Sequence, residues 1–232
     1  MARGYFVTGT DTGVGKTLIT AAIAAACVRR GKRVGVMKPC ETGCQEKNGS
    51  LIPADALILQ QMAQSRDSLA TICPYRFRQP LAPLVAATYD NETVDPDRIR
   101  NIYESMRIRS DIILIEGAGG LLVPVTDTLM NLDLALMLSL PLLIVARLSL
   151  GTINHTLLTE QVACARGAHV SAIVLNQTTP EYGIAEETNP GIIKKFACNR
   201  VLGPVPYLSN NKRSDPGVLA DTADTILQEL LL

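Results

Sequence analysis

The sequence contains a glycine-rich segment with the residue types of a phosphate-binding loop, Gly9-Thr10-Asp11-Thr12-Gly13-Val14-Gly15-Lys16-Thr17. In such loops the glycines let backbone N–H groups converge on phosphate oxygens, the lysine reaches the terminal phosphates and the threonine hydroxyl ligates Mg²⁺. The spacing is irregular, because Thr10 stands where the standard loop has its first glycine and Gly9 comes one residue early. The segment predicts ATP binding; the structural alternative is a glycine-rich turn with a surface lysine.

Asp11 distinguishes this loop from that of a related group of ATPases. The chromosome-partitioning and nitrogenase-iron-protein type carries a signature lysine early in the loop, in K-G-G-x-G-K-T, and Asp11 occupies that position here. The signature lysine, which in those ATPases reaches across a nucleotide sandwiched between two subunits, is therefore missing. This argues against a nucleotide-switched ATPase that binds partners instead of making a product.

Three further charged residues lie at the expected ends of strands or the start of a helix. Glu116 follows an apolar run and precedes Gly117–Gly120, so it is a candidate Mg²⁺ ligand beside a backbone that a ligand can approach closely; its alternative is a turn cap. Lys38 precedes Pro39 and either neutralises phosphate or carboxylate charge or is a solvated edge lysine. Asp55 lies in the first turn of a predicted helix, where compensation of the helix dipole is the favoured explanation from the residue alone.

Two polar segments follow other apolar runs. Gly151–Asn154 opens a predicted helix, whose free N–H groups suit a carboxylate. His155 is next to it and is either a base or a packed, solvated side chain. Asn176 follows a predicted strand, and its amide either reads a base edge or caps a turn.

The elements that must position these residues alternate between short Val- and Ile-rich runs and helix-length amphipathic segments. This pattern is typical of a parallel sheet with crossover helices. Strands are predicted at Tyr5–Thr8, Arg33–Lys38, Asp111–Glu116, Leu142–Arg147, Val170–Asn176 and Val201–Val205. Helices are predicted at Lys16–Arg30, Ala54–Gln64, Asp95–Arg107, Ile153–Ala165, Pro190–Phe196 and Val218–Leu231.

Within that pattern, Asn189 is expected to cap the short helix that begins at Pro190, whereas Pro74, Pro80 and Pro83 leave residues 65–91 unassigned. No repeat or linker divides the chain. We therefore expect one doubly wound, mostly parallel α/β domain over residues 1–232, with ligands beyond the carboxyl ends of the strands.

Composition narrows the function classes. Apolar residues make up 47% of the chain and charged residues 19%, which is enough for a large core and too little charge for disorder. Lys and Arg balance Asp and Glu at 22 each, so nucleic acid and anionic membrane surfaces are not expected partners. Neither a signal peptide nor an apolar run of membrane-spanning length is present, so a cytoplasmic location with reduced thiols is expected. Cys40 and Cys44 are the closest cysteine pair, with weak spacing for a metal or redox site.

Taken together, these segments resemble dethiobiotin synthetases, the ATP-dependent enzymes that form the ureido ring in biotin synthesis. The resemblance rests on the one-residue-longer loop, on Met37-Lys38-Pro39, on Asp55-Ala56 and on Glu116-Gly117-Ala118-Gly119-Gly120. It continues in the helix start that contains Gly151–Asn154 and in Gly203-Pro204-Val205-Pro206-Tyr207-Leu208, so it spans nearly the whole chain in order.

The resemblance implies a reaction. In this family one amine of 7,8-diaminononanoate takes up CO₂ as a carbamate, and ATP phosphorylates the carbamate oxygen. The second amine then closes a cyclic urea, which leaves dethiobiotin, ADP and phosphate. The family is also a homodimer, in which the substrate carboxylate lies at the Gly151–Asn154 helix start of the neighbouring subunit.

The resemblance also implies roles for individual residues. Lys16 and Lys38 would be catalytic, while Thr17, Asp55 and Glu116 would hold Mg²⁺, so that Asp55 becomes a ligand instead of a cap. The residues implied in ATP binding are Thr12, Gly13, Val14, Gly15, Lys16, Thr17, Leu18, Asp55, Glu116, Gly117, Ala118, Gly119, Asn176, Gln177, Pro206, Tyr207 and Leu208. Those implied in substrate binding are Thr42, Gly151, Thr152, Ile153 and Asn154.

Some positions depart from the family. Gly13 replaces an acidic residue of some members and Thr42 replaces serine, whereas Thr178–Asn199, with Asn189, matches poorly.

The nearest alternative within the P-loop group is a cobyrinic acid amidating enzyme. Those enzymes usually carry a further glutamine-hydrolysing domain, which we do not expect in a chain of this length.

Overall fold

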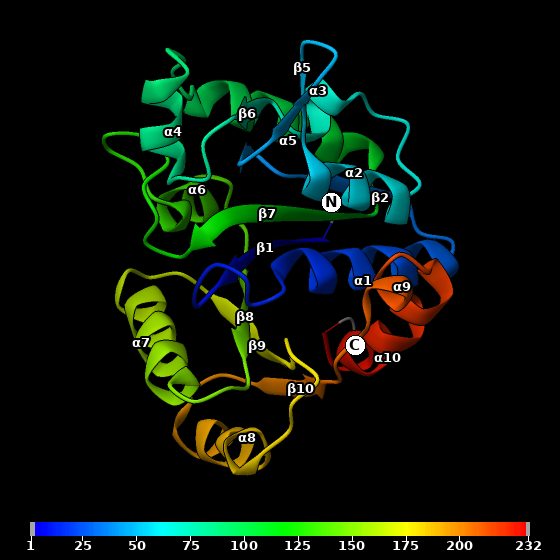
Figure 1. Cartoon of the computed structure of the whole chain (residues 1–232), viewed down its shortest axis with the longest axis vertical. Coiled ribbons are helices and arrows are strands. Elements are labelled where there is room, and N and C mark those ends of the chain that lie inside the picture. The colour runs from blue at the N-terminus through cyan, green and yellow to red at the C-terminus, as the bar shows by residue number, and fades with distance from the viewer. Residues whose placement is uncertain (1–2, 231–232) are drawn as a thin grey trace.

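A central sheet of six parallel strands forms the middle layer of the molecule (Figure 1). The computed structural model describes residues 3–230, apart from the side chains of residues 225 and 227–229. The strand order is β10-β9-β8-β1-β7-β2, so the chain moves from β1 to one edge, returns through β7 and then builds the other half. The strands are β1 (Arg3–Gly9), β2 (Val34–Met37), β7 (Ile112–Gly120), β8 (Leu142–Arg147), β9 (Val170–Asn176) and β10 (Val201–Val205).

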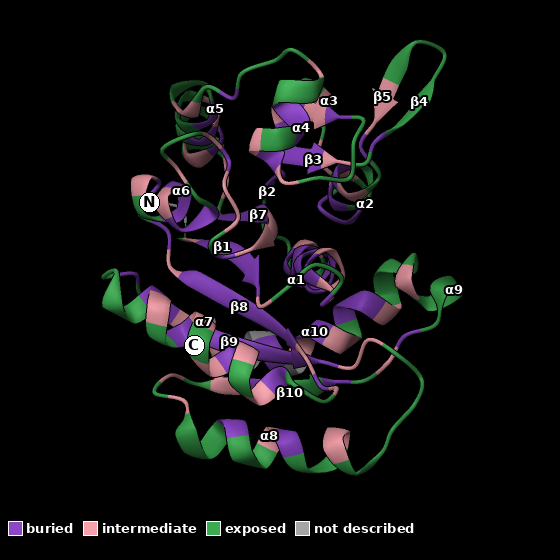
Figure 2. Cartoon of the chain, turned by 60° about the vertical axis from the view of Figure 1, so that its left-hand side comes forward, coloured by how far each residue is buried: buried purple, intermediate pink, exposed green. Residues whose placement is uncertain are grey.

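Helices cover both faces of this sheet (Figures 1 and 2). One face is covered by α1 (Lys16–Arg29), α2 (Ala54–Met62) and α10 (Pro216–Leu230), with the short α9 (Asn210–Arg213) leading into α10. The other face is covered by α5 (Pro96–Arg109), α6 (Asn131–Met137), α7 (Thr152–Ala165) and α8 (Ile184–Phe196). The doubly wound α/β fold predicted from the sequence is confirmed.

The two apolar cores explain the strand sequences. Side chains of β7 alternate between the cores, with Ile112 and Leu114 on the α1 side and Ile113 and Ile115 on the α5 side. Both faces of each central strand are therefore buried, which is why the strands are continuous apolar runs. Helix α1 packs against the sheet, α2 and α10, so its alanine-rich sequence is buried nearly all round.

Smaller elements lie beyond the β2 edge of the sheet (Figures 1 and 2). They are β3 (Cys40–Thr42) paired with β6 (Tyr75–Phe77), the hairpin β4 (Gln45–Lys47) and β5 (Ser50–Ile52), α3 (Leu69–Ile72) and α4 (Pro83–Tyr89). Three of them, α3, β6 and α4, fall in the proline-containing stretch, residues 65–91, that the sequence left unassigned. Pro83 occupies the first position of α4, where the missing N–H costs no helical hydrogen bond.

All six predicted strands are present, but one boundary is wrong. Glu116 does not end its strand, because β7 continues to Gly120, which lies opposite Gly9 after a register shift. Asn131 holds this end of the strand by binding the carbonyl oxygens of Ala118 and Gly120, and Gly119 between them has a φ of 73°.

The predicted short helix at Pro190 is also wrong, since α8 begins six residues earlier, at Ile184. Asn189 is therefore an interior residue of α8 and not its cap. Its side-chain amide donates to the Leu148 carbonyl at 2.8 Å, and both Asn189 and Ile193 are buried. These tertiary contacts stabilise α8 across Pro190, a residue whose missing N–H and fixed ring would otherwise favour the end of a helix.

The remaining helices agree with prediction to within a few residues. Helix α10 starts at Pro216 instead of Val218, and the predicted last residue, Leu231, lies outside the described residues. No described helix combines the length and the apolar character that crossing a bilayer requires.

Candidate active site

The glycine-rich loop joins β1 to α1 and leaves the start of that helix open. Gly13 and Gly15 have φ values of 76° and 95°, a left-handed conformation that other residues rarely adopt. No side chain caps the N-terminus of α1. The free N–H groups and the helix dipole therefore make an anion-binding concavity, as the motif predicted.

Lys16, the first residue of α1, turns its ammonium group back over the loop. Its Nζ donates to the carbonyl oxygen of Asp11 at 3.1 Å, and the residue is only 7% exposed. Burial lowers the pKa of Lys16 from 10.5 to about 8, and nearby Lys38 adds to this effect while Glu116 opposes it. A phosphate group beside Lys16 would restore the charged form.

Asp11, which stands at the signature-lysine position, braces the loop. One carboxylate oxygen accepts from the N–H of Thr12 at 2.7 Å, and the other forms an ion pair with Arg147 at 3.0 Å. The Thr12 hydrogen bond and Arg147 hold the pKa of Asp11 below its usual value. This side chain ties the loop to the end of β8.

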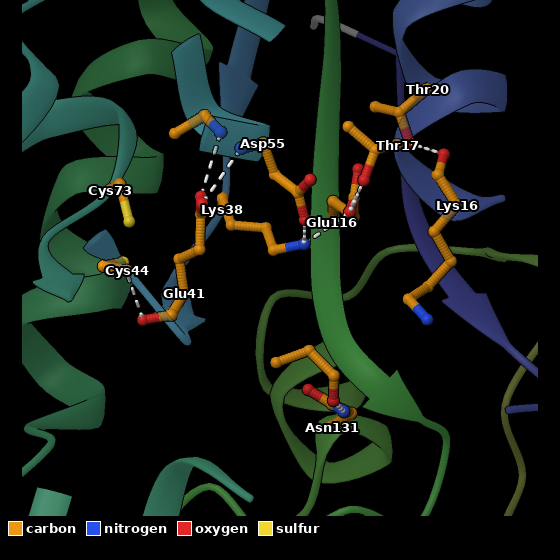
Figure 3. A network of polar contacts seen from close by, with 12 residues as sticks. Lys16, Thr17, Thr20, Lys38, Glu41, Cys44, Asp55, Cys73, Glu116 and Asn131 are labelled. Atoms are coloured by element: carbon orange, nitrogen blue, oxygen red, sulfur yellow. Dashed lines mark hydrogen bonds and ion pairs between the residues drawn. The ribbon is translucent and has the colours of Figure 1, made fainter. Parts of the chain in front are cut away.

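Lys38 joins two acidic residues beside the loop (Figure 3). Its Nζ lies 2.5 Å from Glu116 Oε1 and 2.6 Å from Asp55 Oδ2. The Thr17 hydroxyl donates to the same Glu116 oxygen at 2.8 Å. Lys38 directly follows β2, and Glu116 lies on β7. Asp55 and Thr17 lie in the first turns of α2 and α1, so the fold brings all four residues together.

The charges in this cluster depend on one another. Burial alone would lower the pKa of Lys38, but Glu116 and Asp55 outweigh it and hold that pKa above its ordinary value. Burial would likewise raise the pKa of Asp55, but the Lys38 ammonium lowers it. The lysine therefore remains an ammonium ion and Asp55 a carboxylate throughout the neutral range.

The cluster fits a divalent cation. Glu116 is fully buried and its Oε2 has no hydrogen-bond partner among the described residues. A buried carboxylate oxygen without a partner is costly unless a cation or donor reaches it. Two carboxylates and a hydroxyl beside a phosphate site are the donor set that Mg²⁺ uses with nucleotides.

Glu41 was not identified from the sequence. It lies on β3, and its two carboxylate oxygens accept from the backbone N–H groups of Asp55 and Ala56 at 2.9 and 3.0 Å (Figure 3). It thereby caps α2, whose own preceding residue, Pro53, makes no side-chain cap. Burial, together with the charge of Asp55, raises the pKa of Glu41.

Asn131 is a second residue that the sequence gave no reason to select. Its Nδ2 donates to the carbonyl oxygens of Ala118 and Gly120 at 2.7 and 2.8 Å. A Cβ on Gly117 would lie 2.9 Å from the Phe6 ring and 3.1 Å from the Asn131 side chain, so only glycine fits there. Asn131 therefore holds the glycine-rich end of β7 in place.

A cavity of about 440 Å³ lies over the loop and the Lys38 cluster. It gathers most of the predicted site residues of the loop, the acidic cluster and Thr42. Its lining is Thr12, Gly13, Gly15, Lys16, Thr17, Leu18, Ala21, Lys38, Glu41, Thr42, Asp55, Ile58, Glu116, Ala118, Gly119 and Arg213. Val14 and Gly117 are not part of that lining, and Val14 is fully buried.

Of the predicted adenine-side residues, Asn176 contacts the loop, and none of them lines the cavity. Asn176 donates to the Val14 carbonyl at 2.9 Å, while its buried Oδ1 has no partner among the described residues. The N–H of Gln177 donates to the Val205 carbonyl at 2.9 Å. Tyr207 lies beneath the guanidinium of Arg213, the cavity residue of α9, 5.4 Å from its ring centre.

The predicted carboxylate-binding helix start is formed but does not line this cavity. Gly151 has a φ of 92° and the N-terminus of α7 carries no side-chain cap. Thr152 is buried and donates to the Arg147 carbonyl at 2.5 Å, Ile153 is half-buried and Asn154 is exposed. A role for Gly151–Asn154 toward substrate therefore requires the cavity of another protomer.

The cysteines near the site are free thiols. Cys40, Cys44 and Cys73 are buried, and burial raises the pKa of each. Over residues 3–230 no cluster of three or more His, Cys, Asp or Glu side chains is arranged to hold a metal ion. The Cys40–Cys44 spacing thus gains no support as a metal or redox site.

Comparisons with known proteins agree with this geometry. A family model described as "AAA domain" matches residues 3–214. The ATP-dependent dethiobiotin synthetase BioD of Thermodesulfovibrio yellowstonii is 40% identical over 228 residues, which cover 95% of each chain. The protein of the same name from Bacillus subtilis strain 168 is 36% identical over 208 residues, 90% of this chain and 89% of that one.

Solved structures support the fold alone. The MinC:MinD cell division complex of Aquifex aeolicus matches with a TM-score of 0.58 at 14% identity, over 98% of this chain and 96% of that chain. A ParA family ATPase from Chlorobium tepidum TLS matches with a TM-score of 0.54 at 16% identity, over 98% and 92%. The sequence matches extend along nearly the whole chain and show its family. This chain belongs to the ATP-dependent dethiobiotin synthetases, within the AAA domain family.

Proposed function

We propose that this chain catalyses the ATP- and Mg²⁺-dependent conversion of 7,8-diaminononanoate and CO₂ to dethiobiotin, ADP and phosphate. The observation that carries the proposal is the Lys38–Glu116–Asp55 cluster, which lies beside the phosphate loop in one cavity. Family membership supports the same reaction. An ATPase that only switched between partners would need no second buried lysine opposite the loop.

The nucleotide is proposed to bind along the open start of α1. Backbone N–H groups from Thr12 to Leu18 take the phosphate oxygens, and Lys16 leaves the Asp11 carbonyl for the terminal phosphates. On the other side of the loop, Asn176 presents its free Oδ1 toward the base, bordered by Gln177 and Pro206–Leu208. Gly117–Gly119 let the backbone approach the ligand closely.

Lys38 and Lys16 are proposed to stabilise the charge that gathers where the carbamate meets the γ-phosphate. The carbamate oxygen forms a bond to phosphorus as the bond to ADP breaks. The second amine then attacks the carbamate carbon, and phosphate leaves with the C–O bond pair while the amine loses its proton. No covalent enzyme intermediate is needed, so positioning and preorganised charge supply the catalysis.

Thr17, Asp55 and Glu116 are the residues that would hold Mg²⁺, which neutralises phosphate charge when bound. Lys38 would then exchange its carboxylate partners for the carbamate and the phosphoryl oxygens. Glu41 keeps Asp55 in place during this exchange, because it binds the Asp55 backbone and not its side chain.

The diamine is proposed to lie between Thr42 and a neighbouring protomer. Thr42 lines the cavity beyond Lys38. The open start of α7, Gly151–Asn154, offers N–H groups for the substrate carboxylate and lies outside the cavity of its own chain. A homodimer that brings the two together completes the site.

One assay tests the proposal. Purified protein with diaminononanoate, bicarbonate and Mg-ATP should release ADP in step with dethiobiotin, and ADP release should stop when the diamine is withheld. Equal ATP turnover with and without the diamine would refute the synthetase activity. Turnover with an amide donor and a corrinoid acid would instead favour the amidating alternative.

A further inference from the structure

The two irregular features of the phosphate loop, Gly9 and Asp11, belong to one arrangement. The carbonyl oxygen of Asp11 accepts a hydrogen bond from the Lys16 ammonium at 3.1 Å. A Cβ on Gly9 would lie 2.8 Å from that carbonyl oxygen and 3.1 Å from Lys16 Nζ. The early glycine therefore leaves room for Asp11 and Lys16 to meet behind it.

Arg147, at the end of β8, holds the side chain of Asp11. Its Nη1 donates to Asp11 Oδ2 at 3.0 Å, while Asp11 Oδ1 accepts from the N–H of Thr12 at 2.7 Å. The carbonyl oxygen of Arg147 accepts from the Thr152 hydroxyl at 2.5 Å, which fixes the backbone that carries the guanidinium. Neither Asp11 nor Arg147 lines the cavity over the loop, so the pair acts on the loop from outside that cavity.

The charge of Asp11 gives this pair its importance. Asp11 is the only acid in the segment Gly9–Thr17, which otherwise suits the binding of an anion. Burial lowers the pKa of Lys16 to about 8, and the Asp11 carboxylate is one of the groups that oppose this shift. An unpaired carboxylate here would compete with phosphate for the Lys16 ammonium. While Arg147 neutralises it, the carbonyl oxygen is the group that Asp11 presents to Lys16, and phosphate is the stronger acceptor.

We infer that Arg147 is a positioning residue for the phosphate loop, because it neutralises and holds Asp11 and so leaves Lys16 free to bind phosphate. The inference rests on the proposed function in one respect, namely that the loop binds the triphosphate of ATP. Arg147 acts through Asp11 and lies outside the cavity. It therefore contributes to nucleotide affinity, whereas the chemical step does not depend on it.

Three variants separate the charge of Asp11 from its place in the fold. Arg147→Met leaves the Asp11 carboxylate without its ion-pair partner, Arg147→Lys keeps a cation, and the double variant Asp11→Asn/Arg147→Met removes both charges. Arg33→Met is the control, because Arg33 forms the same kind of ion pair with Asp111 at the amino ends of β2 and β7. Thermal unfolding shows whether each variant is folded, and Arg147→Gln replaces Arg147→Met if the latter does not fold.

Calorimetry without diamine measures the binding of Mg-ATP. Arg147→Met should weaken it about three- to fivefold, the size expected for one partly exposed charge. The double variant should regain most of this loss, and Arg147→Lys and Arg33→Met should stay near the wild type. In steady-state assays Arg147→Met should raise the KM for ATP and leave kcat at saturating ATP near the wild-type value.

Proton uptake provides a readout that a merely structural role would not change. With a pKa of about 8, Lys16 is largely neutral at pH 8.5, and phosphate favours its ammonium form, so ATP binding takes up a proton. In Arg147→Met the unpaired carboxylate should keep Lys16 charged before ATP binds. The uptake, measured in two buffers of different ionisation enthalpy, should therefore shrink in Arg147→Met and return in the double variant.

Wild-type ATP affinity in Arg147→Met would overturn the inference. So would a double variant that binds ATP no better than Arg147→Met, because the loss would then come from a missing brace instead of a freed charge. An equal loss in Arg33→Met would attribute the effect to net charge and would also overturn it. If the wild-type protein bound no Mg-ATP, the proposed function would fail and this inference with it. If it bound ATP but formed no dethiobiotin, only the proposed reaction would fail.

Discussion

Lys38 is buried against Glu116 and Asp55, which makes it the residue with the largest expected effect. Lys38→Ala should lower the rate of ring formation about 100- to 1000-fold, because a preorganised charge at the reacting oxygens is lost. Binding of ADP measured without Mg²⁺ should change little, since Lys38 lies opposite the loop. Steady-state assays and calorimetry measure the two effects, with Lys32→Ala, an exposed lysine, as control. A variant with normal turnover would contradict the assignment.

Lys16 gives the protein a pH dependence that ATP should reveal. Its pKa is lowered by burial to about 8, below the ordinary value of 10.5. Between these values the unfolded chain binds the proton that the folded protein has released, so this group's contribution makes the free energy of unfolding rise with pH from about 8 to 10.5.

ATP binding at pH 8.5 should therefore take up a proton, because the phosphates favour the Lys16 ammonium. Calorimetry in two buffers of different ionisation enthalpy measures this uptake, which should vanish near pH 6.5. Lys16→Arg, which stays charged, should remove the uptake at pH 8.5. Identical heats in the two buffers at pH 8.5 would count against a lowered pKa.

The sequence identified the residues that belong to a local motif or follow an apolar strand. Lys16 and Thr17 have fixed places in the loop, and Glu116 and Lys38 follow buried strands, so spacing alone brought them into consideration. Glu41 and Asn131 act through backbone N–H or carbonyl groups 11 to 15 residues away in the sequence, and Arg213 contacts Leu208 and Tyr207 in a segment that carries no motif for it. No short pattern records such contacts, which is why they became visible only in the folded chain.

At the scale of elements, Glu41 connects β3 to the first turn of α2. Glu41→Ala leaves two helix N–H groups without their carboxylate and should lower the free energy of unfolding by about 1–3 kcal/mol. It should also raise the Mg²⁺ concentration needed for half-maximal activity, because Asp55 loses its backbone anchor. Denaturant unfolding and Mg²⁺ titration test this against Glu46→Ala, an exposed acid on β4. Unchanged stability would show that water replaces the cap.

The sequence predicted the six strands well because their apolar runs have no competing interpretation. It failed at β7 and α8, where tertiary contacts override local preference. Asn131 holds the glycine-rich end of β7 through the Ala118 and Gly120 carbonyls, and Asn189 with Ile193 ties α8 to the core despite Pro190. The short elements beyond β2 were missed because three to seven residues carry too little periodicity to show.

At the scale of the whole molecule, the proposed dimer makes a complementation test possible. Asn154→Asp, at an exposed position of α7, should weaken the diamine far more than ATP, because it places a carboxylate where one must bind. Lys38→Ala removes the other half of the site. In mixed dimers, one of the two sites should contain both native halves.

Mixing the two inactive variants at equal amounts should therefore recover activity, up to about a quarter of the wild-type value for random exchange. Each variant alone serves as the control, and sedimentation confirms that dimers exchange. No recovery despite exchange would mean that each site is built from one chain.

The ion pairs of Lys38 also bear on the order in which ligands load. In the ligand-free protein the Lys38 ammonium already neutralises Glu116 and Asp55. A free divalent cation therefore has to displace an intramolecular partner, whose effective concentration is high. Incoming phosphate gives Lys38 another partner and frees both carboxylates. Nucleotide and Mg²⁺ should then strengthen each other's binding by one shared coupling free energy, whichever arrives first. Such a protein would bind little Mg²⁺ in the absence of ATP and would bind Mg²⁺ and ATP together.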